Sequence, residues 1–381
     1  MSCVVGIDIG TTSTIGILLD TKTNKIIKKV SLKVDLFSPK VGWAEENPNQ
    51  WWSNTKKILI KLIQYSKLKK KKIIALGATG MLPALVILDK NGKVIRNSIQ
   101  QSDGRTGKQI GQLFNYKIQK WFVKKTKCGV NQQLIAPKLL WLKQNEKNNF
   151  KKIHTIFGSY DFINFKLTGK YSIEHNWALE SGLMDFKKKK FTSDLVKLGS
   201  VKLSMLPKIF PSDHILGNIS ENLSKELSLE KNVKVIAGCA DHVVSAFSAG
   251  IKKSGDVLLK FGGAGDILIS TEKPLNDQRL FLDFHIIPNL FMPNGCMAST
   301  GTMLNWFIKN FLSHSKIPES NIYSYLDKKA SQSNILNNKV IILPYFLGEK
   351  TPIHDVHAKG TISGLGLNNT IYDLWIGFLE A

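Results

Sequence analysis

The pattern of apolar and polar positions at the start of the chain predicts a β-meander. Residues 4–9 and 15–20 are rich in β-branched side chains, and residues 10–13 separate them as a tight turn. A third β-rich stretch covers residues 26–34. Beyond it, Asn47-Pro48 is a helix start signal, and apolar residues from Trp51 onward recur at helical spacing.

Strand and helix signals continue to alternate through the middle of the chain. Short apolar runs predict strands at residues 73–77, 84–88 and 233–238, and Pro137 begins a predicted helix. Because strands alternate with helices, the pattern predicts the α/β class.

The strand–turn–strand opening recurs near residue 256. β-rich residues 256–261 and 266–270 flank a turn of small residues at 262–265, which repeats the plan of the N-terminus. A single hydrophobic core stops growing at about 250–300 residues, and this chain has 381. We therefore expect two domains, residues 1–250 and 251–381, each beginning with a hairpin.

The last residues, 373–381, predict an amphipathic helix without a C-terminal stop signal. From this pattern we expect the second domain to be truncated at its C-terminal end. We also expect Trp375 and Phe378 to lack covering partners, with a loss of stability.

Charge adds one qualification to this picture. The chain has 53 Lys and Arg against 29 Asp and Glu, a net charge of +24, yet it has only three arginines: Arg96, Arg105 and Arg279. Nucleic-acid binders concentrate positive charge on one face and rely on arginine, whereas these lysines are spread along the chain. We therefore expect no nucleic-acid partner; attraction of a nucleotide phosphate stays open as a functional use of the charge.

The remaining composition indicates a cytoplasmic chain. The N-terminus lacks a basic segment and carries Asp8 within its apolar run, unlike a signal peptide. No apolar stretch approaches the about 20 residues of a membrane span. The four cysteines, at positions 3, 128, 239 and 296, have no metal-binding spacing and fit a reducing compartment.

Two aspartates are candidates for catalysis. Asp8 stands at the end of the first strand beside a turn of small residues, where a carboxylate can hold Mg²⁺; capping of the turn is the alternative. Asp241 follows the buried strand 233–238, where it can accept a proton from an attacking hydroxyl; capping of the next helix is the alternative.

The two turns and one further pair of residues are candidates for binding. Small residues in both turns allow backbone N–H groups to approach a polyphosphate, although each could be a simple hairpin turn. Asp103 and Arg105 offer an acceptor and a forked donor that suit a sugar, or they form an exposed ion pair. The turn residues are Gly10, Thr11 and Thr12, and Gly262, Gly263, Ala264 and Gly265.

Together these segments resemble the motifs of the FGGY family of carbohydrate kinases, and most closely its xylulokinase branch. The resemblance implies two actin-like (ribonuclease H-like) ATPase-type domains with ATP and sugar between them. It runs in order through all 381 residues. The matching segments are residues 6–12, Trp43, Glu46, Pro48, Trp51 and Trp52, and residues 136–142, 237–242, 261–265, 343–352 and 360–364.

The resemblance implies ATP-dependent phosphorylation of a sugar hydroxyl, with ATP and Mg²⁺ as cofactors. Asp241 is implied as the general base, Asp8 as the Mg²⁺ site and the two turns as phosphate sites. On the sugar side it implies Asp103 and Arg105, together with Met81 and Leu82.

The substrate and the partners stay open in part. A keto-pentose such as xylulose is the first expectation, but Met81-Leu82-Pro83 stands where xylulokinases carry Gln-Met-His, and Gln101 where the family has Trp. Glycerol, ribulose and gluconate are therefore alternative substrates. Because relatives continue past Ala381 with a Gly-rich adenine segment, a silent chain that only binds sugar is a second hypothesis. An actin-like ATPase without a sugar substrate is the third. A homodimer, or a separate chain that supplies the missing segment, stays open as a partner; a membrane is not expected.

Overall fold

The chain forms two compact units in the computed structural model, which describes residues 2–275, 277–313, 315, 317–332, 339–355 and 357–381. Unit 1 comprises Met1–Ser254, Ser270–Gln278 and Leu282–Met292, and unit 2 comprises Gly255–Ile269, Arg279–Phe281 and Pro293–Ala381. We expected a single division after residue 250. Instead, the chain leaves unit 1 after Ser254 and twice returns to it, so unit 1 also contains residues from beyond that division.

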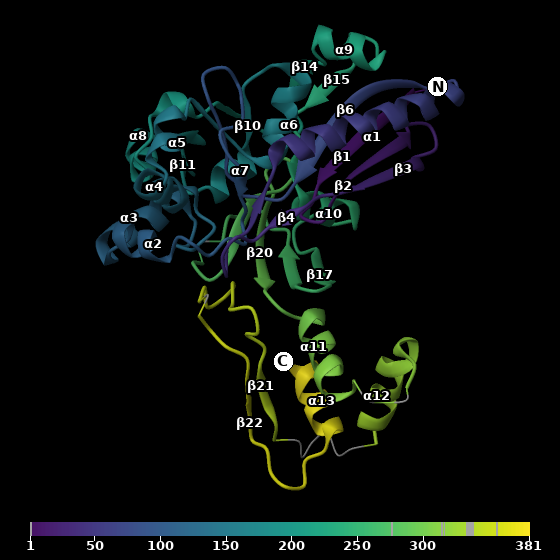
Figure 1. Cartoon of the computed structure of the whole chain (residues 1–381), viewed down its shortest axis with the longest axis vertical. Coiled ribbons are helices and arrows are strands. Elements are labelled where there is room, and N and C mark those ends of the chain that lie inside the picture. Colours follow the sequence, from purple (N-terminus) through teal and green to yellow (C-terminus); the bar gives the residue numbers. More distant parts are fainter. Residues whose placement is uncertain (1, 276, 314, 316, 333–338, 356) are drawn as a thin grey trace. The chain divides into compact units, whose positions relative to one another are not determined.

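A mixed sheet is the centre of unit 1 (Figure 1). Its strand order is β14-β15-β6-β1-β2-β3, with β16 paired to β6, and β1, β15 and β16 all run parallel to β6. The strands are β1 (Ser2–Ile9), β2 (Ser13–Asp20), β3 (Lys25–Lys33), β6 (Lys72–Gly80), β14 (Ile215–Asn218), β15 (Lys234–Ile236) and β16 (Cys239–Ala240). The predicted meander and the predicted strands at 73–77 and 233–238 are confirmed.

One face of this sheet packs against helices α1 (Pro48–Leu68) and α6 (Ser159–Thr168). Burial alternates along β1 and β2, as a strand with one covered face requires. Gly16 lies under α1, where a Cβ atom would come within 2.1 Å of Ile58. A glycine is therefore needed there for the helix to approach the sheet closely.

Smaller elements complete unit 1. The predicted strand at 84–88 is shorter than expected and pairs with β9 rather than with the central sheet, and the predicted helix at Pro137 is confirmed as α4. The strands are β4 (Leu36–Phe37), β5 (Glu45–Glu46), β7 (Val86–Leu88), β8 (Ser98–Ile99), β9 (Thr155–Phe157), β10 (Ser172–Glu174), β11 (Met184–Asp185), β12 (Lys190–Phe191) and β13 (Lys208–Phe210). The helices are α2 (Gly107–Leu113), α3 (Tyr116–Thr126), α4 (Ile135–Asn145), α5 (Lys147–Lys152), α7 (His175–Glu180), α8 (Ser193–Val196), η1 (Lys197–Gly199), η2 (Leu203–Met205), α9 (Glu221–Leu227) and α10 (Asp241–Ser248).

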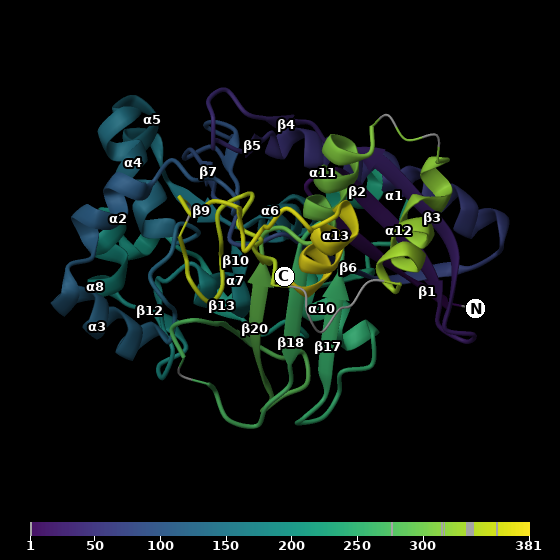
Figure 2. The same cartoon turned by 90° about the horizontal axis from the view of Figure 1, so that it is seen from below.

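Unit 2 begins with the second predicted hairpin. β17 (Val257–Phe261) and β18 (Gly265–Ile269) are antiparallel, and β18 pairs with β20 (Phe291–Met297); Figure 2 shows the three strands side by side. The division between the units passes through β20 and through β19 (Phe281–Phe284), which completes the strand order β17-β18-β20-β19. The other elements are α11 (Gly301–Phe311), η3 (Glu319–Asn321), α12 (Ile322–Ala330), β21 (Ile341–Leu343), β22 (Thr361–Ser363) and α13 (Ile371–Glu380).

The last helix is covered by its own unit, contrary to expectation. Trp375 is 0% exposed and Phe378 is 2% exposed, and both rings pack against Phe307 of α11. Trp375 Nε1 also donates a hydrogen bond to Asp327 Oδ1 over 2.9 Å. A capping box at Thr370 begins α13. The prediction of uncovered apolar residues is therefore wrong, because α11 and α12 supply the cover.

Two further expectations concern the whole chain. Each of the four cysteines is a free thiol. Among the described residues, no helix combines the length and the apolar character that crossing a membrane requires.

Candidate active site

Three adjacent parallel strands of unit 1 end at the same edge of the sheet. Asp8 of β1 pairs in register with Thr79 of β6, and Thr79 pairs with Cys239 of β16. Asp241 follows β16 after one residue and begins α10. The fold therefore brings both predicted aspartates to the carboxyl ends of the strands on either side of β6, the usual place for ligands in open α/β sheets.

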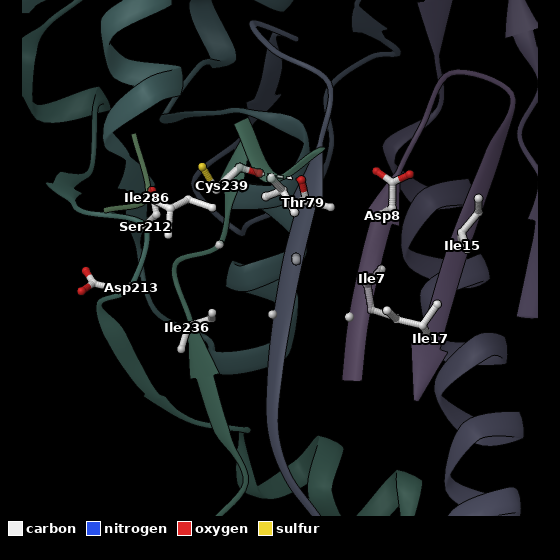
Figure 3. A pocket seen from close by; sticks show the side chains of 15 residues that line it. Ile7, Asp8, Ile15, Ile17, Thr79, Ser212, Asp213, Ile236, Cys239 and Ile286 are labelled. Carbon is white, nitrogen blue, oxygen red and sulfur yellow. Dashed lines mark hydrogen bonds between the residues drawn. The ribbon is translucent and has the colours of Figure 1, made fainter. Parts of the chain in front are cut away.

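A glycine between β15 and β16 makes this alignment possible. Gly238 has φ +76°, and a Cβ atom on it would lie 1.8 Å from the Ala78 carbonyl oxygen. The chain can therefore bend there and still run beside β6 only without a side chain. Thr79 Oγ1 then donates a hydrogen bond to the Cys239 carbonyl over 2.7 Å (Figure 3), which fixes β16 directly before Asp241.

Asp8 has the environment of a cation ligand. Its Oδ1 is buried and has no hydrogen-bond partner among the residues that the structure describes. Burial and, as a smaller contribution, the negative charge of Asp241 raise the pKa of Asp8 to about 6. These features fit a divalent cation. It would offset the repulsion between the Asp8 and Asp241 carboxylates, and it would give the buried Asp8 Oδ1 a partner.

Asp241 is more accessible. Its side chain is 47% exposed, and Oδ1 accepts a hydrogen bond from the backbone N–H of His242 over 2.7 Å. The residue that caps α10 is Ala240, and Asp241 is the first residue inside the helix. Asp241 is therefore not the N-cap residue that the alternative required. It lies in the first turn of α10, where the helix dipole favours a negative charge.

An apolar cavity of about 380 Å³ lies on the open face of the same sheet (Figure 3). Five of its fifteen lining residues are isoleucines, and the lining also includes Asp8 and Thr79. The cavity therefore places apolar side chains beside the Asp8 carboxylate. Its labelled lining is Ile7, Asp8, Ile15, Ile17, Thr79, Ser212, Asp213, Ile236, Cys239 and Ile286.

The first small-residue turn adjoins Asp8. Thr11 and Thr12 are exposed, and the turn is closed by a hydrogen bond from Gly10 N to Ser13 O over 3.1 Å. Val34 N also donates to Thr12 O over 3.0 Å. The turn is thus held at both ends and leaves its two threonines open to solvent.

The second turn, in unit 2, packs on the beginning of α11. Gly262 O accepts hydrogen bonds from Gly301 N and from Thr300 Oγ1, each over 2.9 Å. A Cβ atom on Gly301 would lie 2.5 Å from Gly262 O, so this contact also requires a glycine. The carbonyls of the turn, which spans Gly262, Gly263, Ala264 and Gly265, therefore cap a helix.

Asp103 and Arg105 are brought together and are not an exposed pair. Arg105 Nε donates to Asp103 Oδ1 over 2.8 Å and Nη2 to Oδ2 over 2.6 Å, and neither side chain has exposed surface. Asp103 Oδ2 also accepts from Ala44 N over 2.7 Å. The guanidinium lies 3.8 Å from the ring centre of Trp43 and 4.9 Å from that of Trp141. The surface ion-pair alternative is therefore wrong.

Met81 and Leu82 follow β6 directly and are almost fully buried, at 2% and 5% exposure. Their segment is tied to the Asp103 segment by Lys138 of α4, whose Nζ donates to Pro83 O over 3.1 Å and to Gln100 O over 2.9 Å. Burial lowers the pKa of Lys138 to about 7. Sequence reasoning included Lys138 in a motif but gave it no role, because nothing local indicates that it is buried.

Sequence reasoning also missed the surroundings of His242. Its Nε2 lies 2.7 Å from Asp283 Oδ2, and Glu180 Oε1 lies 4.0 Å from the same nitrogen. Among the described residues, these three side chains form a group of His, Asp and Glu whose ligand atoms lie close enough together to hold a metal ion. The position of His242 directly after Asp241 could have indicated a role near the candidate base. No local sequence pattern connects either residue with Asp283.

Comparison with known proteins shows the class to which the chain belongs. Models of the FGGY family of carbohydrate kinases match residues 3–248 for the N-terminal domain and 262–381 for the C-terminal domain. The chain belongs to the FGGY family of carbohydrate kinases. As a member it is a sugar kinase, and the family implies ATP as a substrate.

Several xylulose kinases are among its relatives. The xylulose kinase of Bacillus subtilis is 28% identical over 367 residues, which cover 96% of this chain and 72% of the relative. The solved structure of the xylulose kinase from Rhodospirillum rubrum is 41% identical with a TM-score of 0.92, and the match covers 99% of this chain and 76% of that one. The gluconate kinase of Lactobacillus acidophilus is 25% identical with a TM-score of 0.90, over 100% and 76% of the two chains.

These findings revise three expectations. The truncation of the second domain is not supported, because the C-terminal family domain is present. The presence of both domains also argues against a silent chain that retains only a sugar-side domain. Neither a homodimer nor a separate chain that supplies a missing segment is supported by them.

Proposed function

We propose that this chain phosphorylates a keto-pentose such as xylulose with ATP, and that Asp241 is the general base. The observation that carries the proposal is the position of Asp8 and Asp241 at the carboxyl ends of the two strands that flank β6. The similarity to xylulose kinases at up to 41% identity supports the choice of sugar.

In the proposed reaction Asp241 accepts the proton of a sugar hydroxyl while the hydroxyl oxygen attacks the γ-phosphorus of ATP and ADP leaves. The 47% exposure of Asp241 makes it accessible to a substrate. Asp8 would hold Mg²⁺, which neutralises charge on the transferring phosphoryl group. The exposed threonines of the first turn and the small residues of the second turn would bind phosphate oxygens.

On the sugar side, we assign Asp103 and Arg105 a supporting part. Both side chains are fully buried and paired, so they hold the loop around them rather than offer groups to a ligand. Met81 and Leu82, anchored through Lys138, would shape the apolar side of the sugar pocket.

Phosphorylation of gluconate is the second candidate. The similarity to the L. acidophilus gluconate kinase, at a TM-score of 0.90, is close to that of the R. rubrum xylulose kinase, at 0.92. The two candidates differ in substrate charge and are separable by one assay.

The test is ADP release with Mg²⁺-ATP and a panel of xylulose, ribulose, gluconate and glycerol. We expect turnover with xylulose that is lost in Asp241→Asn. Asp194→Asn is the matched control, since Asp194 is 45% exposed and also lies in the first turn of a helix. Turnover with gluconate alone would replace the proposed sugar, and full activity of Asp241→Asn would remove Asp241 as the base.

A further inference from the structure

The imidazole of His242 bridges two carboxylates. Its Nδ1 lies 3.3 Å from Asp241 Oδ1, and its Nε2 lies 2.7 Å from Asp283 Oδ2. A carboxylate accepts hydrogen bonds and cannot donate them. Contact with a carboxylate on each side therefore favours a ring that carries a proton on both nitrogens.

The far side of this network is buried. The side chain of Asp283 is 0% exposed and that of Glu180 is 8% exposed. Burial lowers the pKa of His242, but the charges and hydrogen bonds of Asp283, Asp241 and Glu180 outweigh it and raise the pKa well above its ordinary value. Burial raises the pKa of the nearby Cys128 thiol, so that group adds no charge. The surroundings of the ring therefore favour its protonated form.

The fold fixes Asp283 in place. Asn176 Nδ2 donates to the Phe284 carbonyl over 3.0 Å, and Phe284 N donates to Asn176 Oδ1 over 2.7 Å. This two-bond clamp holds the residue next to Asp283. The segment Leu282–Met292 belongs to unit 1 although residues on both sides of it belong to unit 2. Asp283 therefore lies in unit 1 because the chain returns to this unit after residues 279–281.

Binding of a metal ion is an alternative explanation for the proximity of His242, Asp283 and Glu180, since their ligand atoms lie within 4.8 Å of one another. The 2.7 Å hydrogen bond between His242 and Asp283 already explains the closest approach. A cation at Nε2 would have to displace the proton there. The hydrogen-bonded network is therefore the simpler arrangement.

We propose that His242, held by Asp283 and Glu180, is a positioning residue that orients the Asp241 carboxylate. The inference rests on the proposed function, in which Asp241 is the base. The 3.3 Å contact between His242 Nδ1 and Asp241 Oδ1 restricts rotation of the Asp241 carboxylate, so the base keeps one direction toward a substrate. Loss of the network should therefore slow the chemical step and leave substrate binding nearly unchanged.

The test compares Asp283→Asn and His242→Gln with the wild type and with His214→Gln, whose imidazole is exposed and stacks on Phe210. In both network variants we expect kcat to fall by about tenfold or more, with little change in either KM. This split between kcat and KM distinguishes positioning of the base from a general loss of structure, which would also weaken substrate binding. The control should match the wild type.

Two further measurements keep the outcomes separate. Unchanged kcat in folded Asp283→Asn and His242→Gln would overturn the positioning role, whereas an active Asp241→Asn would overturn the base itself. If Asp283→Asn does not fold, ¹⁵N NMR of the His242 ring in the wild type decides. A cationic ring at pH 7 supports the inference, and a neutral ring overturns it.

Discussion

The guanidinium of Arg105 stacks 3.8 Å from the ring centre of Trp43 while its nitrogens hold both oxygens of Asp103. Only a planar, forked cation can stack and form a two-point ion pair at the same time. One side chain therefore fixes the loop that contains Asp103 and attaches it to two tryptophans, Trp43 and Trp141.

Arg105→Met should destabilise unit 1 strongly. The substitution leaves Asp103 buried without its cation, which typically costs about 3–5 kcal/mol. Urea unfolding followed by tryptophan fluorescence would measure the loss. Lys108→Met, at an exposed position on α2, should change little. Equal midpoints for the two variants would contradict the role of the buried pair.

Lys138 should make stability depend on pH. Its pKa in the fold is about 7 because of burial, below the ordinary 10.5, so between these values the unfolded chain binds a proton that the native chain does not. Stability therefore gains a contribution as pH rises through this window. The unfolding free energy of the wild type should rise relative to Lys138→Met from pH 7 to 10. A constant difference between the two proteins would show that Lys138 is not buried as a neutral amine.

Gly238→Ala should be far more damaging than Gly42→Ala. The two glycines have φ +76° and +77°, so both substitutions pay the same backbone cost of about 1–2 kcal/mol. Only at Gly238 does the new Cβ meet a backbone atom, the Ala78 carbonyl oxygen at 1.8 Å, whereas nothing lies within 4 Å at Gly42. The difference in melting temperature between the two variants measures the destabilisation caused by the steric clash at Gly238. Equal melting temperatures would contradict the clash.

Trp375→Ala should loosen unit 2. Removal of a fully buried tryptophan costs about 3–5 kcal/mol, and here it also removes the hydrogen bond to Asp327. Hydrogen exchange of α11 and α13 would report the change. Trp306→Ala is the control, because Trp306 is 39% exposed and should cost less. Faster exchange in the control than in Trp375→Ala would contradict the assignment of the core.

Local patterns predicted the parts of the fold that depend on neighbouring residues. The alternation along β1 and β2, the start of α1 at Pro48 and both hairpin turns were visible in the sequence. The positions of Asp8 and Asp241 at strand ends followed from the same patterns. These features need only short-range turn chemistry and the periodicity of strands and helices.

Features made by distant segments could not be predicted. The burial of Arg105 depends on Trp43 and Trp141, which come from other elements, so an exposed pair was equally consistent with the sequence. Trp375 is covered by helices that precede it in the chain, and Asp283 reaches His242 only because the chain returns to unit 1. No periodicity records such long-range contacts.

The return of Leu282–Met292 into unit 1 has a practical consequence for dissecting this enzyme. A fragment cut at Ser254 would keep Asp8, Asp241 and His242 but would lose Asp283 and the strand that Asn176 clamps. The unit is thus not contiguous along the gene, and no single proteolytic cut can release it whole. Its independent production requires a design that joins residues 270–278 and 282–292 to the N-terminal segment.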